Sequence, residues 1–181
     1  MEELVDVLDE NGKKIGVCTR AEVHEKGLWH KSVHVWIVSN SGKLLLQKRC
    51  KTKKFYPNVW DCAFAGHVDY DESSLNACLR EGKEELGIEL DEKKLKFLFT
   101  NKESLFHDGI VNNEFVDIFV YEDDVDLNNL TLQADEVSDV KMVEAEKFFQ
   151  LIKKHSKDIL YHSDKEYEYL ENYIKNNLVC V

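Results

Sequence analysis

The segment from residue 66 to residue 88 concentrates acidic side chains that are suited to binding a metal ion. Its charged candidates are Glu72, Arg80, Glu81, Glu84 and Glu85. Glutamates that lie a turn or less apart on a helix repel each other at neutral pH, and one arginine cannot balance four carboxylates. A hard divalent cation such as Mg2+ binds carboxylate oxygens together with substrate phosphates. The spacing therefore indicates a metal site, and a solvated acidic helix face is the alternative.

The same segment predicts an amphipathic helix over residues 73–86. Apolar or small residues recur there close to the helical period, at Leu75, Cys78, Leu79, Gly82 and Leu86. Gly87 follows as a natural left-handed terminator. The helix then has one apolar face, and its glutamates converge on the opposite face.

The whole segment fits the pattern G-x5-E-x7-R-E-U-x-E-E-x-G-U, where U is a bulky apolar residue. In this pattern the chain resembles the Nudix hydrolases, and residues 66–88 are its Nudix box. The one departure is Gly82, where the family has an apolar side chain, and we interpret it as closer packing of the helix. The resemblance implies an α/β fold, an α/β/α sandwich that binds Mg2+ or Mn2+ and hydrolyses a diphosphate linked to another group X.

The resemblance also implies the roles of the box residues. Water attacks a phosphorus atom while metal ions neutralise phosphate charge and lower the pKa of a bound water. The implied metal ligands are Glu81, Glu84 and Glu85. Arg80 is expected to orient these glutamates rather than to touch the substrate. The general base is a box glutamate or a downstream carboxylate, Glu114 or Glu136, and the box does not choose between them.

The amino-terminal half is similar to the Nudix subgroup that includes type I isopentenyl diphosphate isomerase, an enzyme of the same fold. This similarity implies basic residues that hold the substrate diphosphate, namely Arg20, Arg49 and Lys53. In the isomerase, histidines that match His24, His30 and His67 bind a metal. Here we expect His67 to line the substrate pocket.

Two substitutions argue against isomerase activity. Ala65 stands where the isomerase has its essential cysteine, and Asn112 replaces the first glutamate of an E-x-E pair, of which Glu114 remains. The spacing from His24 to His30 is also one residue short. Because the isomerase typically lacks an intact Nudix box and this chain keeps one, we expect hydrolysis. Isomerisation and a non-catalytic, nucleotide-binding regulatory role are the alternatives.

Four aromatic residues are candidates for stacking on a nucleotide base, although packing in the core is the commoner use of such side chains. They are Trp29, Trp60, Phe64 and Phe106.

Composition agrees with an enzyme of this size. The 181 residues are 43% hydrophobic without a linker or repeat, so we expect one domain over residues 1–181. A net charge of −11 argues against stable binding to nucleic acid or an anionic membrane, and a small-molecule diphosphate remains compatible. The five scattered cysteines indicate reduced, mostly buried thiols. We expect a cytoplasmic monomer or homodimer.

Periodicity places the elements around the box. Strands over 4–8 and 15–19 flank the turn Asn11-Gly12 and predict an amino-terminal β-hairpin, and strands over 34–40 and 43–49 predict a second hairpin. Residues 58–66 lead into the box loop. Further strands are expected at 94–100 and 113–121, and helices at 144–155 and 165–177. This order fits a mixed β-sheet between helices.

Overall fold

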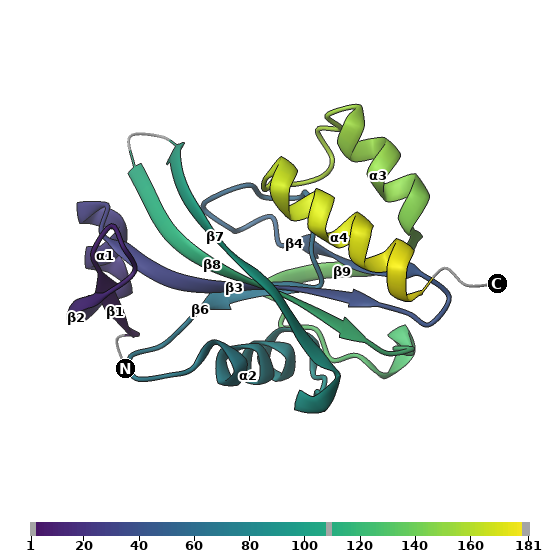
Figure 1. The fold of residues 1–181 in the computed structure, drawn as a ribbon, viewed down its shortest axis with the longest axis horizontal. Helices are drawn as coiled ribbons and strands as arrows, with labels where there is room; N and C mark the ends of the chain where they lie inside the picture. Colours follow the sequence, from purple (N-terminus) through teal and green to yellow (C-terminus); the bar gives the residue numbers. More distant parts are fainter. Residues whose placement is uncertain (1–2, 108–109, 179–181) are drawn as a thin grey trace.

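The protein is represented by a computed structural model that describes residues 3–107 and 110–178. Within these ranges, a nine-stranded mixed sheet has helices on both faces (Figure 1). The strands are β1 (Leu4–Leu8), β2 (Lys14–Thr19), β3 (Trp29–Val38), β4 (Lys43–Arg49), β5 (Trp60–Asp61), β6 (Phe64–His67), β7 (Leu95–His107), β8 (Ile110–Glu122) and β9 (Val137–Glu144). The helices are α1 (Arg20–Lys26), α2 (Ser74–Leu86), α3 (Ala145–Lys153) and α4 (Asp164–Asn177). Two short 3-10 helices are η1 (Glu92–Lys94) and η2 (Leu127–Asn129). The predicted α/β/α sandwich is confirmed.

Strand β3 organises the sheet because it pairs with four neighbours. It runs antiparallel to β1, β4 and β6 and parallel to β8, so the sheet is mixed, as predicted. Strand β8 also pairs with β7, and β9 pairs with β4. The carboxyl end of β6 leads into the box loop, so the pairing of β3 with β6 anchors that loop.

Both predicted hairpins are present. Strands β1 and β2 pair antiparallel with Val5 opposite Cys18, and Gly12 in the connecting turn has a φ of 81°. Strands β3 and β4 pair with Val38 opposite Leu44, and Gly42 in their turn has a φ of 77°. These positive φ values favour glycine, which explains both turn signals in the sequence.

Two apolar layers cover the two faces of the sheet. Along β3 the side chains alternate between faces, so Trp36 packs in the layer formed with α3 and α4, while Val35 packs in the layer formed with α2. Figure 1 shows α2 on one side of the sheet and α3 and α4 on the other. Helix α4 packs on the sheet through Leu170 and Ile174, both buried.

Helix α2 is the predicted box helix. Ser73 is its N-cap and accepts a hydrogen bond from the backbone N–H of Asn76 at 3.1 Å, and Gly87 ends it in the left-handed conformation with a φ of 70°. A Cβ atom at Gly82 would lie 3.2 Å from the ring of Phe64. The departure from the family pattern at Gly82 therefore allows closer packing, as we interpreted it.

The sequence analysis did not predict every element. Helix α1 and strand β9 were not predicted, and β7 and β8 extend well beyond the predicted ranges to form one long hairpin. Helix α1 has seven residues, too few to show a period, but Thr19 and Glu22 form a capping box that marks its start.

The described cysteines fit the expectation of free, mostly buried thiols. Cys50, Cys62 and Cys78 are buried and Cys18 is half-buried, while Cys180 lies outside the described residues. Within the described ranges, no helix combines the length and the apolar character needed to cross a lipid bilayer.

Candidate active site

One cavity of about 480 Å³ brings the predicted site residues together. It is bounded by the box helix, the amino-terminal hairpin and α1, the β7–β8 hairpin and the segment before α4. Every predicted catalytic, substrate-binding and metal-binding side chain lines it, namely Arg20, Arg49, Lys53, His67, Arg80, Glu81, Glu84 and Glu85. The sheet order therefore unites residues from opposite ends of the chain.

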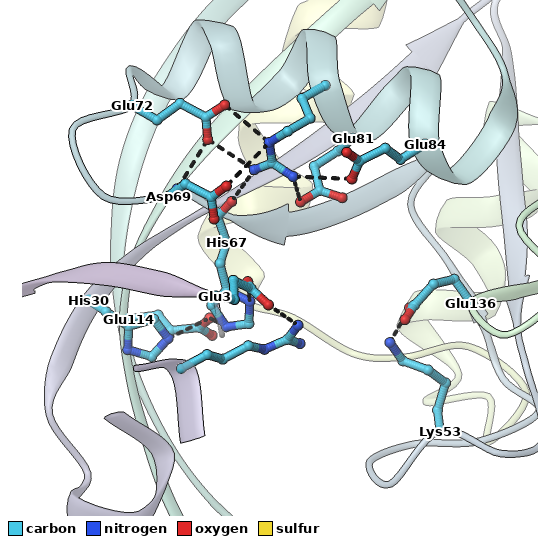
Figure 2. Close-up of polar contacts among 12 residues, drawn as sticks. Glu3, His30, Lys53, His67, Asp69, Glu72, Glu81, Glu84, Glu114 and Glu136 are labelled. Atoms are coloured by element: carbon cyan, nitrogen blue, oxygen red, sulfur yellow. Dashed lines mark hydrogen bonds and ion pairs between the residues drawn. The ribbon is translucent and has the colours of Figure 1, made fainter. Parts of the chain in front are cut away.

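Arg80 is the centre of an ion-pair network at the box helix. Its guanidinium donates to Glu72 at 2.9 Å, to Glu81 at 2.7 Å and to Glu84 at 3.3 Å. It also donates to the backbone carbonyl of His67 at 2.9 Å. Figure 2 shows these carboxylates converging on the one guanidinium. The arginine is occupied by protein groups, which agrees with a role in orienting the glutamates.

The box glycine makes room for one of these carboxylates. A Cβ atom at Gly66 would lie 2.1 Å from the carboxyl group of Glu81. A separation this short is far below van der Waals contact, so a side chain at this position would displace Glu81. The glycine of the motif is therefore required by the close approach of strand β6 to the box glutamate.

Burial opposes the ionised form of two glutamates of α2, Glu81 and Glu85. Burial raises the pKa of Glu81 to about 7 and that of Glu85 to about 8, and repulsion between them adds to the shift of Glu85. Glu85 is only 5% exposed, and its carboxylate accepts a hydrogen bond from the side-chain amide of Gln47 at 3.0 Å. Buried carboxylates with raised pKa values require a counter-charge in order to ionise. The donor set of Glu81, Glu84 and Glu85 fits a hard divalent cation.

Each of the three predicted phosphate-binding residues already has a partner in the protein. Arg20 pairs with Glu3 at 2.9 Å, and Lys53 pairs with Glu136 across the cavity (Figure 2). Arg49 donates to Asp61 at 3.3 Å, and its other contacts are backbone carbonyls of the following loop.

Those carbonyls belong to Phe55 and Tyr56, each accepting from the guanidinium of Arg49 at 3.1 Å. Arg49 thus fixes the loop that carries Lys53. Its structural contacts leave it less suited to phosphate binding than the sequence predicted.

Three histidines meet at the amino-terminal end of the cavity. The ring centroids of His24, His30 and His67 lie 5.1 to 5.3 Å apart, although the spacing between the first two is a residue short. Glu114 joins them, with its carboxylate 3.5 Å from His30 Nε2 and 3.9 Å from His67 Nε2. The short spacing does not separate the rings, because α1 turns His24 back toward His30 on β3.

This histidine cluster has the chemistry of a metal site. Nε2 of His30 and Nε2 of His67 are buried without a hydrogen-bond partner among the described residues. Burial lowers the pKa of His24 and of His67, so these rings are neutral, the form that binds a metal. Asn112, which replaces a glutamate of the isomerase, donates to Glu114 at 2.8 Å and orients that carboxylate.

The four aromatic candidates for stacking lie away from the cavity. Phe64 is fully buried in the core, Phe106 is 74% exposed, and Trp29 packs on Phe115. Trp60 instead carries Lys141 on its ring at 3.6 Å. Within the described ranges, none of these four aromatic residues lines the cavity.

Its aromatic lining consists of Phe55, Tyr56 and Tyr161. Several polar lining residues were also missed, namely Glu3, Asp61, Glu103 and His162. No motif marks them, because each reaches the cavity through long-range packing.

Comparison with known proteins agrees with this geometry. A family model described as the NUDIX domain matches residues 28–163. The chain belongs to the NUDIX family. It is 38% identical over 155 residues to a Nudix hydrolase of Clostridium acetobutylicum that is named as uncharacterized, covering 83% of this chain and 74% of the relative. The protein is therefore an enzyme of the Nudix hydrolase family, whose general reaction is hydrolysis of a nucleoside diphosphate linked to X.

Two further similarities bear on subgroup and fold. This Nudix protein is 29% identical over 152 residues to isopentenyl-diphosphate delta-isomerase 2 of Photorhabdus laumondii, covering 84% of this chain and 83% of the relative. The crystal structure of DR0079 from Deinococcus radiodurans superimposes with a TM-score of 0.72 at 18% identity, covering 94% and 98% of the two chains. The first confirms the resemblance to the isomerase subgroup, and the second concerns the fold.

Proposed function

We propose that this Nudix protein is a Mg2+-dependent or Mn2+-dependent hydrolase that cleaves the diphosphate bond of a nucleoside diphosphate linked to X. The observation that supports it is that Glu81, Glu84 and Glu85 line the same cavity as Arg20 and Lys53. Such a cavity offers metal ligands and phosphate-binding cations to the same substrate.

The proposed roles follow from the contacts. Arg80 positions Glu81 and Glu84 through its two ion pairs. Arg20 and Lys53 donate charged hydrogen bonds to phosphate oxygens, and each must exchange a carboxylate partner for the substrate. A bound divalent cation supplies neutralisation of the phosphate charge and a bound water of lowered pKa.

The test is product release from a panel of nucleoside diphosphate derivatives, with Mg2+, with Mn2+ and with chelator. We expect activity only with metal, and a loss of at least about 100-fold in Glu84→Gln, which removes one ligand charge and keeps the shape. Glu89→Gln, which alters a highly exposed glutamate beyond the helix, is the matched control. Full activity of Glu84→Gln would refute the assigned mechanism, and tight ligand binding without turnover would indicate the regulatory role.

A second candidate is isomerisation of isopentenyl diphosphate, which the cluster of His24, His30, His67 and Glu114 favours. Ala65 on β6 argues against isomerisation, because it occupies the position that we align with the isomerase cysteine. Within the described ranges, no cysteine lines the cavity to replace that thiol. Incubation with isopentenyl diphosphate and analysis for the allylic isomer tests this candidate, and an allylic product would establish it.

A further inference from the structure

Two histidines line the wall of the cavity beside α4, and each is paired with a carboxylate. Nδ1 of His34 lies 3.2 Å from one oxygen of Glu166 and 3.3 Å from the other. Nε2 of His162 lies 2.7 Å from Asp61. The two rings are tilted against each other with centroids 4.3 Å apart, so the two pairs form one unit. None of these four residues belongs to the Nudix box or to the cluster of His24, His30 and His67.

The carboxylate of Glu166 is built into the fold rather than placed at the surface. It is fully buried, and it accepts a hydrogen bond from the indole N–H of Trp36 at 2.8 Å as well as its contact with His34. It comes from α4, which begins just after the segment that matches the family model. Burying a charged carboxylate costs free energy unless the charge is paired. Among the described residues, the carboxylate of Glu166 is paired only with Trp36 and with histidine rings.

These contacts fix what each ring offers to a ligand. Because Nδ1 of His34 faces the carboxylate of Glu166, Nε2 is the ring nitrogen of His34 that remains for a ligand. Burial opposes the charged form of His162, but Glu166 and Asp61 outweigh it and raise its pKa to about 9. The doubly protonated ring of His162 then presents Nδ1–H as a donor. Neither nitrogen has a hydrogen-bond partner among the described residues, and both rings line the cavity.

A third polar group borders the same wall. Glu103 of β7 lies on the cavity lining, with its carboxylate held by the side-chain amide of Asn101. A hydrocarbon group placed against this wall would remove charged groups from water without replacing their hydrogen bonds. A hydroxyl group both donates and accepts, so neighbouring hydroxyls can pair with Nε2 of His34 and with Nδ1 of His162 whichever of these nitrogens carries a proton.

We propose that His34 and His162, positioned by Glu166 and Asp61, bind hydroxyl groups of X, and that X is therefore a polyhydroxylated group such as a sugar rather than an isoprenoid chain. The proposal rests on the proposed function for the presence of a diphosphate in the same cavity. His34 and His162 are specificity-determining residues here, and Glu166 and Asp61 are positioning residues.

The test measures binding rather than turnover, by calorimetry on the full chain with Mg2+ present. The probes are ribose 5-phosphate, which carries hydroxyls, and isopentyl phosphate, which carries a hydrocarbon of similar length. Methylenediphosphonate, which cannot be hydrolysed, reports the phosphate-binding residues alone. We expect ribose 5-phosphate to bind at least about tenfold more tightly than isopentyl phosphate. Equal binding of the two phosphates by the unmodified protein would overturn the proposal without any variant.

Variants assign the preference to these residues. His162→Phe and Glu166→Gln should abolish the preference for ribose 5-phosphate and leave the affinity for methylenediphosphonate unchanged. Glu168→Gln, an exposed position on the same helix, is the matched control and should keep the preference. A variant that weakens all three probes equally, or that keeps the preference, would show a purely structural role for the pair. Absence of hydrolysis with the preference intact would instead count against the proposed function alone.

Discussion

The position of the Glu81 carboxylate depends on a single residue, Gly66, which has no side chain to collide with it. Because a Cβ atom would lie 2.1 Å from the carboxyl group of Glu81, we expect Gly66→Ala to displace this proposed metal ligand. A displacement of about 1 Å can cost about 100-fold in rate, so kcat/KM should fall by about that factor. Steady-state kinetics at saturating Mg2+ measures the effect.

The control for Gly66→Ala is Gly16→Ala. A Cβ atom at Gly16 would meet only Val7, at 4.0 Å, in ordinary contact. This variant should retain full activity. Equal activity of the two variants would show that Gly66 does not position Glu81.

The buried carboxylates of Glu81 and Glu85 predict a pH dependence of stability for the metal-free protein. Their pKa values rise from 4.5 to about 7 and about 8, so between pH 4.5 and pH 8 the folded state binds more protons than the unfolded state. The contribution of these two groups to the free energy of unfolding should therefore be highest in the acidic part of this range and fall as pH rises toward 8, by an amount on the order of a few kcal/mol. Urea denaturation in chelator across this range measures it.

Glu85→Gln isolates the contribution of Glu85. A glutamine cannot ionise, so the variant should lose less stability than the unmodified protein between pH 5 and pH 8. Glu89→Gln, at an exposed position, should follow the unmodified protein. Parallel curves for all three proteins would contradict the role assigned to buried charge at this position.

At the scale of elements, the box helix α2 is capped at both ends, by Ser73 and by Gly87. Ser73 caps α2 through Asn76 N–H, and Glu81 and Glu85 lie two or more turns further on. Ser73→Ala should therefore lower the free energy of unfolding by about 1 kcal/mol and leave kcat largely unchanged. Denaturant titration together with kinetics measures both quantities. Ser73→Asp keeps a capping oxygen and should restore stability, whereas a loss of activity in Ser73→Ala with stability intact would contradict this separation.

Helix α1 shows how a short element alters a site. Its seven residues start at the capping box of Thr19 and Glu22 and end at Gly27, which has a φ of 59°. The tight turn at Gly27 brings His24 back against His30, at 5.3 Å between ring centroids. The element therefore compensates for a spacing that would separate the two rings in an extended chain.

At the scale of the whole molecule, a divalent cation should stabilise the folded state, because the carboxylates of α2 converge only there. Ligand binding to the folded state alone contributes about 2.7 kcal/mol at a concentration 100 times the dissociation constant. We expect the melting temperature to rise by several degrees and to saturate with Mg2+ or Mn2+. Differential scanning calorimetry measures the shift.

The ionic control for this prediction is NaCl at matched ionic strength, which should give a much smaller shift without saturation. The variant control is Glu84→Gln, which should bind metal more weakly. A melting temperature that is indifferent to both divalent cations would contradict a preformed site.

We also propose that residues 1–181 form one domain, since the cavity draws on residues from Glu3 to His162.

How much the sequence predicted differs between local and long-range features. The limits of α2 followed from the apolar period and from the terminator Gly87, and both hairpins followed from their glycine turns. Arg49 was predicted to bind phosphate, yet its contacts hold a loop and Asp61. Charge alone indicates that a residue is polar, and its partner is decided by neighbours that are distant in the chain.

The sequence by itself determined the box helix, its closely spaced carboxylates and the family, because these depend on residue types at fixed spacing within one segment. Only the tertiary structure decided what surrounds them. It joined His34 to Glu166 across 132 positions and excluded Phe64 from the cavity by burying it. The physical reason is that strand order and the packing of α4 on the sheet bring such residues together, and neither is encoded in a local period.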